Sequence, residues 1–257
     1  RSAMIARGSG AGRRIGYSGQ WFSPLFYTDR VERCFYEFQE IERLLRLLEP
    51  LSLAPEHVSD WPELVLPVDA RERAEEFFAA NFSGPVLGMH PGSVWGTKRW
   101  PVEYFAETGA RALSAGAQVV LFAGPGEEDM ACRAEALMRE KLGESVAGRI
   151  KNLSGALSLV DLAAYIGRLN CYLTNDSGPM HMAWSQRVPV VALFGPTVRK
   201  LGFAPRGKDS IMMEATNLDC RPCGLHGPQS CPRGHHHCMT LLTPELVWPE
   251  VASRLGV

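Results

Sequence analysis

From Val86 onward, short apolar runs alternate with segments of helical character, and this alternation constrains the fold more than any other feature. The apolar runs have the length of buried strands and fall at Val86–Met89, Gln118–Ala123, Ile150–Leu153, Cys171–Thr174 and Val190–Phe194. Helices are expected between them, at Pro101–Ala115, at Asp129–Lys141 and from a Ser158 cap to Ile166. Strands that alternate with helices in this way predict an α/β fold with a doubly wound parallel sheet.

The loops whose glycine and polar residues suit ligand binding all follow the carboxyl end of a predicted strand. Their sequences are HPGS, GPGE, SGAL, NDSG and FGPT. In open α/β sheets, ligands bind at the edge where the carboxyl ends of the strands meet. The pattern therefore predicts one ligand site assembled from several loops.

The segment Thr174–Ala183, TNDSGPMHMA, carries the strongest site signal. It reads as a strand end, a small turn and a helix N-terminus, whose first amides have no partner inside the helix and favour an anion. Gly178 allows close approach of the backbone, Asp176 can accept from hydroxyl groups, and His181 can donate toward a phosphate. These parts suit a nucleotide-linked sugar.

Composition excludes several classes of function. The 257 residues are 46% hydrophobic and 21% charged, as in a globular enzyme, and the net charge of −1 offers no basic field for nucleic acid. Apolar runs stay far below the roughly 20 residues of a membrane span. Seven cysteines, an odd number, favour a reducing cytosol over a disulfide framework, so a cytoplasmic location is expected.

The N-terminal third reads as a different kind of segment. A helix tail is expected at Ser2–Arg7 and a short strand at Arg14–Tyr17, so the chain is interpreted as beginning inside a domain. Leucine spacing then predicts a helix within Glu37–Leu53. An extended connection, Pro55–Pro67, a helix at Arg71–Asn81 and a break at Ser83–Pro85 follow, and they set expected domains of 1–82 and 83–257.

Five segments together resemble the successive motifs of glycosyltransferase family 9, the heptosyltransferases of lipopolysaccharide core assembly. They are HPGSVWGTKRWPVEYFAE, LFAGPGEED, LSGALSLVDLAAYIGR, LTNDSGPMHMAWS and PVVALFGPT, and the likeness extends over about Val86–Val257. The resemblance implies the GT-B arrangement of two Rossmann-like halves. The C-terminal half would be whole and the N-terminal half truncated, with residues 1–82 as its remnant and the connection.

The resemblance also implies a reaction and its partners. The N-terminal half would take the lipopolysaccharide inner-core acceptor and the C-terminal half ADP-heptose, with inversion at the sugar and no metal or other cofactor. The family's general base is expected upstream of Arg1, so this chain is expected to bind donor without transferring sugar. The enzyme would be cytoplasmic, with peripheral contact at the inner membrane.

Individual residues receive roles on chemistry combined with this resemblance. Lys98 would neutralise the diphosphate as the sugar leaves, the alternative being a solvated lysine. Gly92 and Ser93 would bind phosphate, or form a plain turn. Asp176, Ser177, Gly178 and His181 would bind heptose hydroxyls and diphosphate, the alternative for this turn being a helix cap. Glu127 or Glu128 would accept from ribose hydroxyls, or would only favour a helix N-terminus. The backbone around Leu157, Ala156–Ser158, would contact adenine, as the resemblance implies.

A cysteine cluster near the C-terminus leaves two interpretations open. Cys220, Cys223, Cys231 and Cys238 have the spacing of a zinc knuckle and lie among histidines. Similar segments occur in many members of the family that this chain resembles, whose chemistry needs no metal. A surface loop of reduced thiols or adventitious disulfides is therefore the other interpretation, and no metal is assigned.

Two other functional classes remain alternatives. The chain would be a non-catalytic nucleotide-binding fragment if it bound ADP without transfer. It would be another GT-B enzyme if it preferred a different nucleotide sugar, and an epimerase would need more acid–base residues in its cleft. Donor profiling separates these classes.

Overall fold

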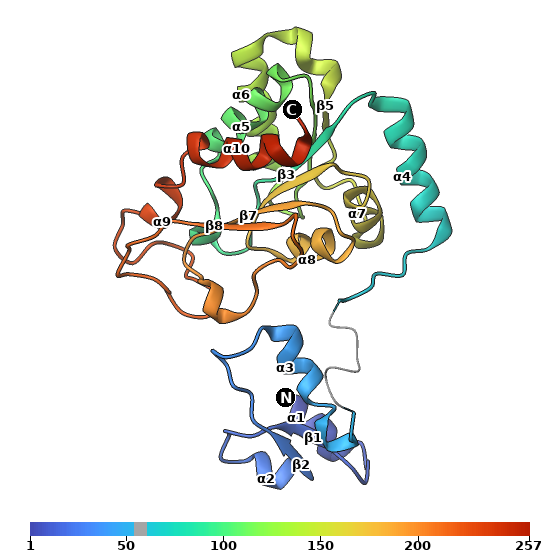
Figure 1. Cartoon of the computed structure of the whole chain (residues 1–257), viewed down its shortest axis with the longest axis vertical. Coiled ribbons are helices and arrows are strands. Elements are labelled where there is room, and N and C mark those ends of the chain that lie inside the picture. The colour runs from blue at the N-terminus through green and yellow to red at the C-terminus, as the bar shows by residue number, and fades with distance from the viewer. Residues whose placement is uncertain (54–60) are drawn as a thin grey trace. The chain divides into compact units, whose positions relative to one another are not determined.

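The computed structural model describes residues 1–53 and 61–257. The chain divides into two compact units, residues 1–62 together with 199–203, and residues 63–198 together with 204–257. Figure 1 labels most helices and strands of both. Residues 55–60 of the expected connection Pro55–Pro67 lie outside the described residues. Within the described ranges, no helix is both long and apolar enough to span a bilayer.

The smaller unit pairs two short parallel strands with short helices. Ile15 of β1 is in register with Asp29 of β2. The unit consists of α1 (Ser2–Gly8), β1 (Ile15–Tyr17), α2 (Ser23–Phe26), β2 (Asp29–Val31), α3 (Glu40–Arg46) and the 3-10 helices η1 (Glu49–Leu51) and η5 (Arg199–Leu201). The expected helix at Ser2–Arg7 and the expected strand at Arg14–Tyr17 are confirmed.

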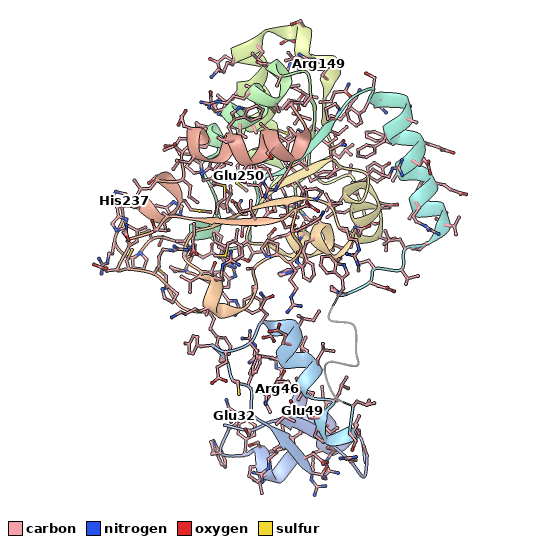
Figure 2. The ribbon with its side chains drawn as sticks, viewed as in Figure 1. Glu32, Arg46, Glu49, Arg149, His237 and Glu250 are labelled. Carbon is pink, nitrogen blue, oxygen red and sulfur yellow. The ribbon has the colours of Figure 1, made fainter. Side chains whose placement is uncertain are left out.

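Helix α3 is shorter than the Glu37–Leu53 segment predicted from leucine spacing. A capping box starts it, in which the side chains of Gln39 and Glu42 satisfy each other's backbone amides. The helix ends by Leu47, because Pro50 has no backbone amide to donate to the carbonyl of Arg46 and its ring would clash with that carbonyl. Arg46 then pairs with Glu49 at 2.8 Å (Figure 2), which closes the turn into η1.

The larger unit is built on a six-stranded sheet in the order β5-β4-β3-β6-β7-β8, with every neighbouring pair parallel. Its parallel α/β architecture confirms the predicted fold class. The elements are α4 (Val68–Asn81), β3 (Val86–His90), η3 (Gly96–Lys98), α5 (Val102–Ser114), β4 (Gln118–Leu121), α6 (Glu128–Leu142), η4 (Glu144–Arg149), β5 (Ile150–Asn152), α7 (Leu159–Ile166), β6 (Cys171–Asn175), α8 (Gly178–Ser185), β7 (Val190–Phe194), β8 (Ile211–Glu214), α9 (His237–Thr240) and α10 (Pro244–Leu255).

Both faces of this sheet are covered. Every residue of β3, β4, β6 and β7 is buried. Alternate strand residues, such as Leu87, Leu173 and Leu193, belong to one core cluster with residues of α5, α6 and α10. Helices α4, α7 and α8 form a second packed group, in which α8 contacts β6 and β7. Continuous apolar strands are the consequence of this double coverage.

The strand order reverses direction between β3 and β6. Chain order runs from β3 to β4 and β5 on one side, and from β6 to β7 and β8 on the other. The two connections therefore diverge between β3 and β6, and doubly wound sheets bind ligands outside the carboxyl ends of the strands at such a point. The loops after β3 and β6 are HPGS and NDSG, the loops predicted to carry the site.

Candidate functional site

A buried ion pair joins the two loops at this switch point. Lys98, at the end of η3, places its Nζ 2.6 Å from Oδ2 of Asp176, which directly follows β6. Lys98 is 8% exposed and Asp176 6% exposed. The alternative of a solvated lysine is therefore wrong, because the loop turns the ammonium inward to a carboxylate.

Two further side chains fix the pair. The Thr197 hydroxyl, in the loop after β7, donates to the same Asp176 oxygen at 2.7 Å. Asn175 joins the loops through its amide, which donates to the carbonyl oxygens of Pro91 and Gly92 and accepts from the backbone amide of Trp100. The loops after β3, β6 and β7 are thus connected by polar contacts in a buried setting, where such networks are strong.

The first turn of α8 borders this pair and carries no side-chain cap. Ser177 is its N-cap residue, and its hydroxyl lies 3.3 Å from the Thr174 hydroxyl without capping the helix. By contrast, Ser158 caps α7 as predicted, by accepting from the amide of Asp161. The amides at the start of α8, including that of Gly178, have no intrahelical acceptor and so remain suited to an anion.

His181 lies one turn into α8 and is held as a neutral ring. Its Nδ1 accepts from the indole nitrogen of Trp184 at 3.0 Å, so the proton of the neutral imidazole is on Nε2. Burial lowers the pKa of His181; the Asp176 carboxylate opposes this effect and Lys98 adds to it. The ring is therefore positioned as a hydrogen-bond donor near the ion pair.

A second polar group lies at the ends of β3 and β4. His90 contacts the Tyr172 hydroxyl through Nδ1 at 3.1 Å, and its Nε2 lies 3.5 Å from Oε2 of Glu127. This contact with His90 lowers the pKa of the Glu127 carboxyl, against the opposing effect of burial. A Cβ on Gly92 would lie 2.0 Å from Oε2 of Glu127, so the acid packs directly against the glycine.

The remaining predicted residues lie on the same edge but make weaker connections. Ser93 is buried, and its carbonyl accepts from Arg99 at 2.7 Å. Leu157 is half-buried in the loop between β5 and α7. Glu128 lies beside Gly155, whereas Glu127 is the acid that packs against Gly92.

Three residues of the candidate site, His90, Asn175 and Thr197, were not predicted from the sequence. Each stood inside a quoted motif but was not assigned a role, because its part is to hold another side chain. A polar residue at the end of an apolar strand was the available signal for His90 and Asn175. Thr197 had no separate signal, since its partner is distant in the sequence.

The cysteine-rich segment follows β8 and ends in α9, which contains Cys238. Its four cysteines are free thiols, with Cys238 buried. Across residues 1–53 and 61–257, no group of three or more His, Cys, Asp or Glu side chains is arranged to hold a metal ion. The segment enters the site in another way, through contacts with the loop that carries Lys98.

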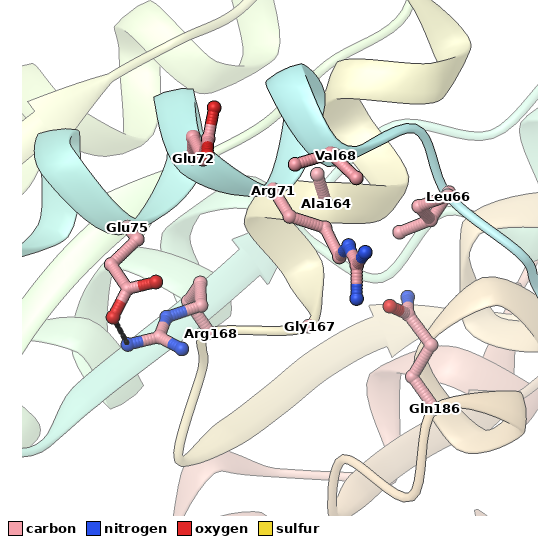
Figure 3. A pocket seen from close by; sticks show the side chains of 9 residues that line it. All are labelled: Leu66, Val68, Arg71, Glu72, Glu75, Ala164, Gly167, Arg168 and Gln186. Atoms are coloured by element: carbon pink, nitrogen blue, oxygen red, sulfur yellow. Dashed lines mark ion pairs between the residues drawn. The ribbon is translucent and has the colours of Figure 1, made fainter.

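A pocket of about 370 Å³ lies elsewhere on the larger unit (Figure 3). It is next to the carboxyl ends of α7 and α8, which return to the amino ends of the strands. Arg168 pairs there with Glu75 at 3.8 Å. The pocket is therefore at the opposite edge of the sheet from the Lys98–Asp176 pair. Its lining residues are Leu66, Val68, Arg71, Glu72, Glu75, Ala164, Gly167, Arg168 and Gln186.

Comparison with known proteins places these features in a family. The model of glycosyltransferase family 9 (heptosyltransferase) matches residues 1–227. Lipooligosaccharide heptosyltransferase 2 of Campylobacter jejuni is 32% identical over 168 residues, which are 65% of this chain and 50% of that protein. Lipopolysaccharide heptosyltransferase 2 of Escherichia coli is 30% identical over 198 residues, 76% of this chain and 54% of that protein. The chain thus spans about half the length of these curated relatives.

Solved structures share the fold. The E. coli ADP-heptose lipopolysaccharide heptosyltransferase II superposes with a TM-score of 0.76 at 23% identity, over 99% of this chain and 73% of that one. The family 9 glycosyltransferase of Veillonella parvula gives a TM-score of 0.80 at 24% identity, over 98% and 70%.

Proposed function

This chain belongs to glycosyltransferase family 9, and from that premise we propose that it provides the donor-binding part of a heptosyltransferase of the lipopolysaccharide inner core. The observation that carries the proposal is the buried Lys98–Asp176 pair at the topological switch point, beside the uncapped start of α8. A cation, a hydrogen-bond acceptor and free helix amides together match a diphosphate joined to a sugar.

The proposed donor is ADP-heptose. Lys98 and the first amides of α8 would meet the diphosphate, with the backbone of Gly92 and Ser93 on its other side. Asp176, Ser177 and His181 would contact heptose hydroxyls. Glu127 would accept from the ribose hydroxyls, and the backbone around Leu157 would contact adenine. An E. coli heptosyltransferase of similar fold has been solved with ADP-2-deoxy-2-fluoro heptose, which supports a donor of this class.

In the proposed reaction, a hydroxyl oxygen of the acceptor attacks the anomeric carbon of heptose. The bond from that carbon to the diphosphate oxygen breaks as the new bond forms on the opposite face, so the configuration inverts and ADP leaves. The Lys98 ammonium would stabilise the negative charge that develops on the leaving diphosphate. Because the lysine and the helix amides meet this charge, the proposed reaction requires no divalent cation.

The proposed acceptor is the lipopolysaccharide inner core, and the proposed location is the cytoplasm, with contact at the inner face of the membrane. The general base would belong to the acceptor-binding part of the protein and must reach the attacking hydroxyl. No residue of the donor site is assigned that role.

Calorimetric titration of this chain with nucleotide sugars tests the proposal. We expect ADP-heptose to bind more tightly than UDP-glucose or GDP-mannose, and EDTA to leave its affinity unchanged. Lys98→Met should weaken ADP binding, whereas Lys208→Met, at an exposed lysine, should not. Tighter binding of another nucleotide sugar would favour the alternative of a different GT-B enzyme.

Transfer is tested separately, by ADP release with an inner-core acceptor. A chain that binds ADP-heptose tightly and shows no acceptor-dependent release would fit the non-catalytic alternative for this chain on its own. Release with inversion of the anomeric configuration would support the full reaction.

A further inference from the structure

The cysteine-rich loop of residues 219–236 packs directly on the loop that presents Lys98. The Pro228 carbonyl accepts from both the amide and the hydroxyl of Thr97, at 3.4 and 2.5 Å. Gln229 accepts from the amide of Gly96 at 3.1 Å and donates to the carbonyl of Val94 at 3.1 Å. The residues that make these contacts, Val94, Gly96 and Thr97, lie directly before Lys98 in the sequence.

The two backbones touch, with no space for side chains between them. A Cβ on Gly96 would lie 2.3 Å from the carbonyl oxygen of Gln229. Gly227 has a φ of +76°, and a Cβ there would lie 2.9 Å from the Thr97 hydroxyl. Glycine is therefore required at both positions, because any side chain would separate the loops.

His236 makes the contact nearest to the lysine. Its Nε2 lies 2.8 Å from the carbonyl oxygen of Thr97, and since a carbonyl only accepts, the ring donates. That carbonyl belongs to the peptide group between Thr97 and Lys98. His236 has a φ of +51°, a left-handed geometry in which His and Asn are enriched. The ring thus holds the peptide from which the lysine side chain starts.

We propose that His236 is a positioning residue for Lys98, and that the cysteine-rich loop serves the donor site as its support. The proposal rests on the proposed role of Lys98 in diphosphate binding. Lys98 has a flexible four-carbon stem, so its ammonium meets Asp176 and a diphosphate at a defined point only if its backbone is fixed.

Three consecutive histidines provide a matched experiment. His235 and His237 stack on each other with ring centroids 4.2 Å apart, and His237 lies at the surface (Figure 2). His236→Gln retains an amide donor with the reach of Nε2, whereas His236→Asn suits the left-handed backbone but is one methylene shorter. We expect His236→Asn to weaken ADP binding to the 257-residue chain about three- to tenfold, the value of one hydrogen bond. His236→Gln and His237→Asn should bind nearly as the wild type does.

A double-mutant cycle separates positioning from general stability. In a Lys98→Met background, His236→Asn should have no further effect on ADP affinity, because its effect passes through the lysine. Titrations are made below the melting temperature of each variant. Equal weakening by the Asn and Gln variants, or an undiminished effect of His236→Asn without Lys98, would overturn the inference. If Lys98→Met itself leaves ADP affinity unchanged, the proposed function fails instead.

Discussion

The structural role of Lys98 and its proposed role in donor binding can be measured separately, which tests the site most directly. The lysine balances the buried carboxylate of Asp176, and we propose that it also meets the donor diphosphate. Lys98→Met keeps the length of the side chain, but among the described residues it leaves the Asp176 carboxylate with the Thr197 hydroxyl as its side-chain partner. Removing one partner of a buried pair costs about 3–5 kcal/mol of unfolding free energy. Because the two side chains remain 10% and 7% exposed, we expect Lys98→Met to lower the unfolding free energy by about 3 kcal/mol, the lower end of this range.

The double variant Lys98→Met/Asp176→Asn should behave differently. It removes both charges while the Asn oxygen still accepts from Thr197, so its stability should return to within about 1 kcal/mol of the wild type. ADP affinity should stay at least about tenfold reduced in both variants, because the charged hydrogen bond to phosphate is lost in both. Urea unfolding and calorimetry measure the two quantities on the same samples.

Two results would refute this reasoning. A double variant as unstable as Lys98→Met would mean that the ion pair does not carry the stability. A double variant that binds ADP like the wild type would mean that Lys98 does not contact the diphosphate. Lys208→Met, at an exposed lysine of the same unit, controls for the loss of a positive charge.

Three further variants test the neighbouring residues. Burial lowers the pKa of His181 in the folded chain, so below the unfolded value of about 6.5 the unfolded chain binds more protons, and the unfolding free energy decreases as the pH is lowered. His181→Gln should reduce this pH dependence in urea titrations between pH 7 and 5. Asn175→Leu leaves buried carbonyl and amide groups without partners and should lower the unfolding free energy by about 2–4 kcal/mol, a prediction that an unchanged melting curve contradicts. Glu127→Gln should weaken ADP about three- to tenfold but leave inorganic pyrophosphate binding unchanged, whereas equal loss for both ligands would argue against a ribose contact.

The central strands were predictable because they are buried on both faces. Strand β7, Val190–Phe194, has the predicted bounds, and β3 and β6 differ from prediction by one residue at their ends. Strand β8, Ile211–Glu214, was not predicted, because it is short and has only one strand beside it. Helix α10 was also not predicted; it contains Pro249, which normally argues against a helix interior.

Features of the candidate site were predictable where one loop carries them, whereas contacts between separate loops were not. The NDSG turn showed its own features, since strand, turn and helix start are contiguous in sequence. The pairing of Lys98 with Asp176 depends on the order of strands in the sheet, which local sequence patterns do not contain. The support of η3 by His236 likewise joins segments separated by most of the unit.

The contact between Gly92 and Glu127 restricts how members of the family can diverge. A methyl group at position 92 would meet the end of the acid, and also its Cβ at 3.1 Å, so the carboxylate would have to leave His90. The two positions should therefore vary together among related sequences. We expect an acid at position 127 to accompany glycine at 92, and a larger residue at 92 to accompany a shorter side chain at 127. Such covariation would identify, from sequences alone, a contact that connects two loops of one site.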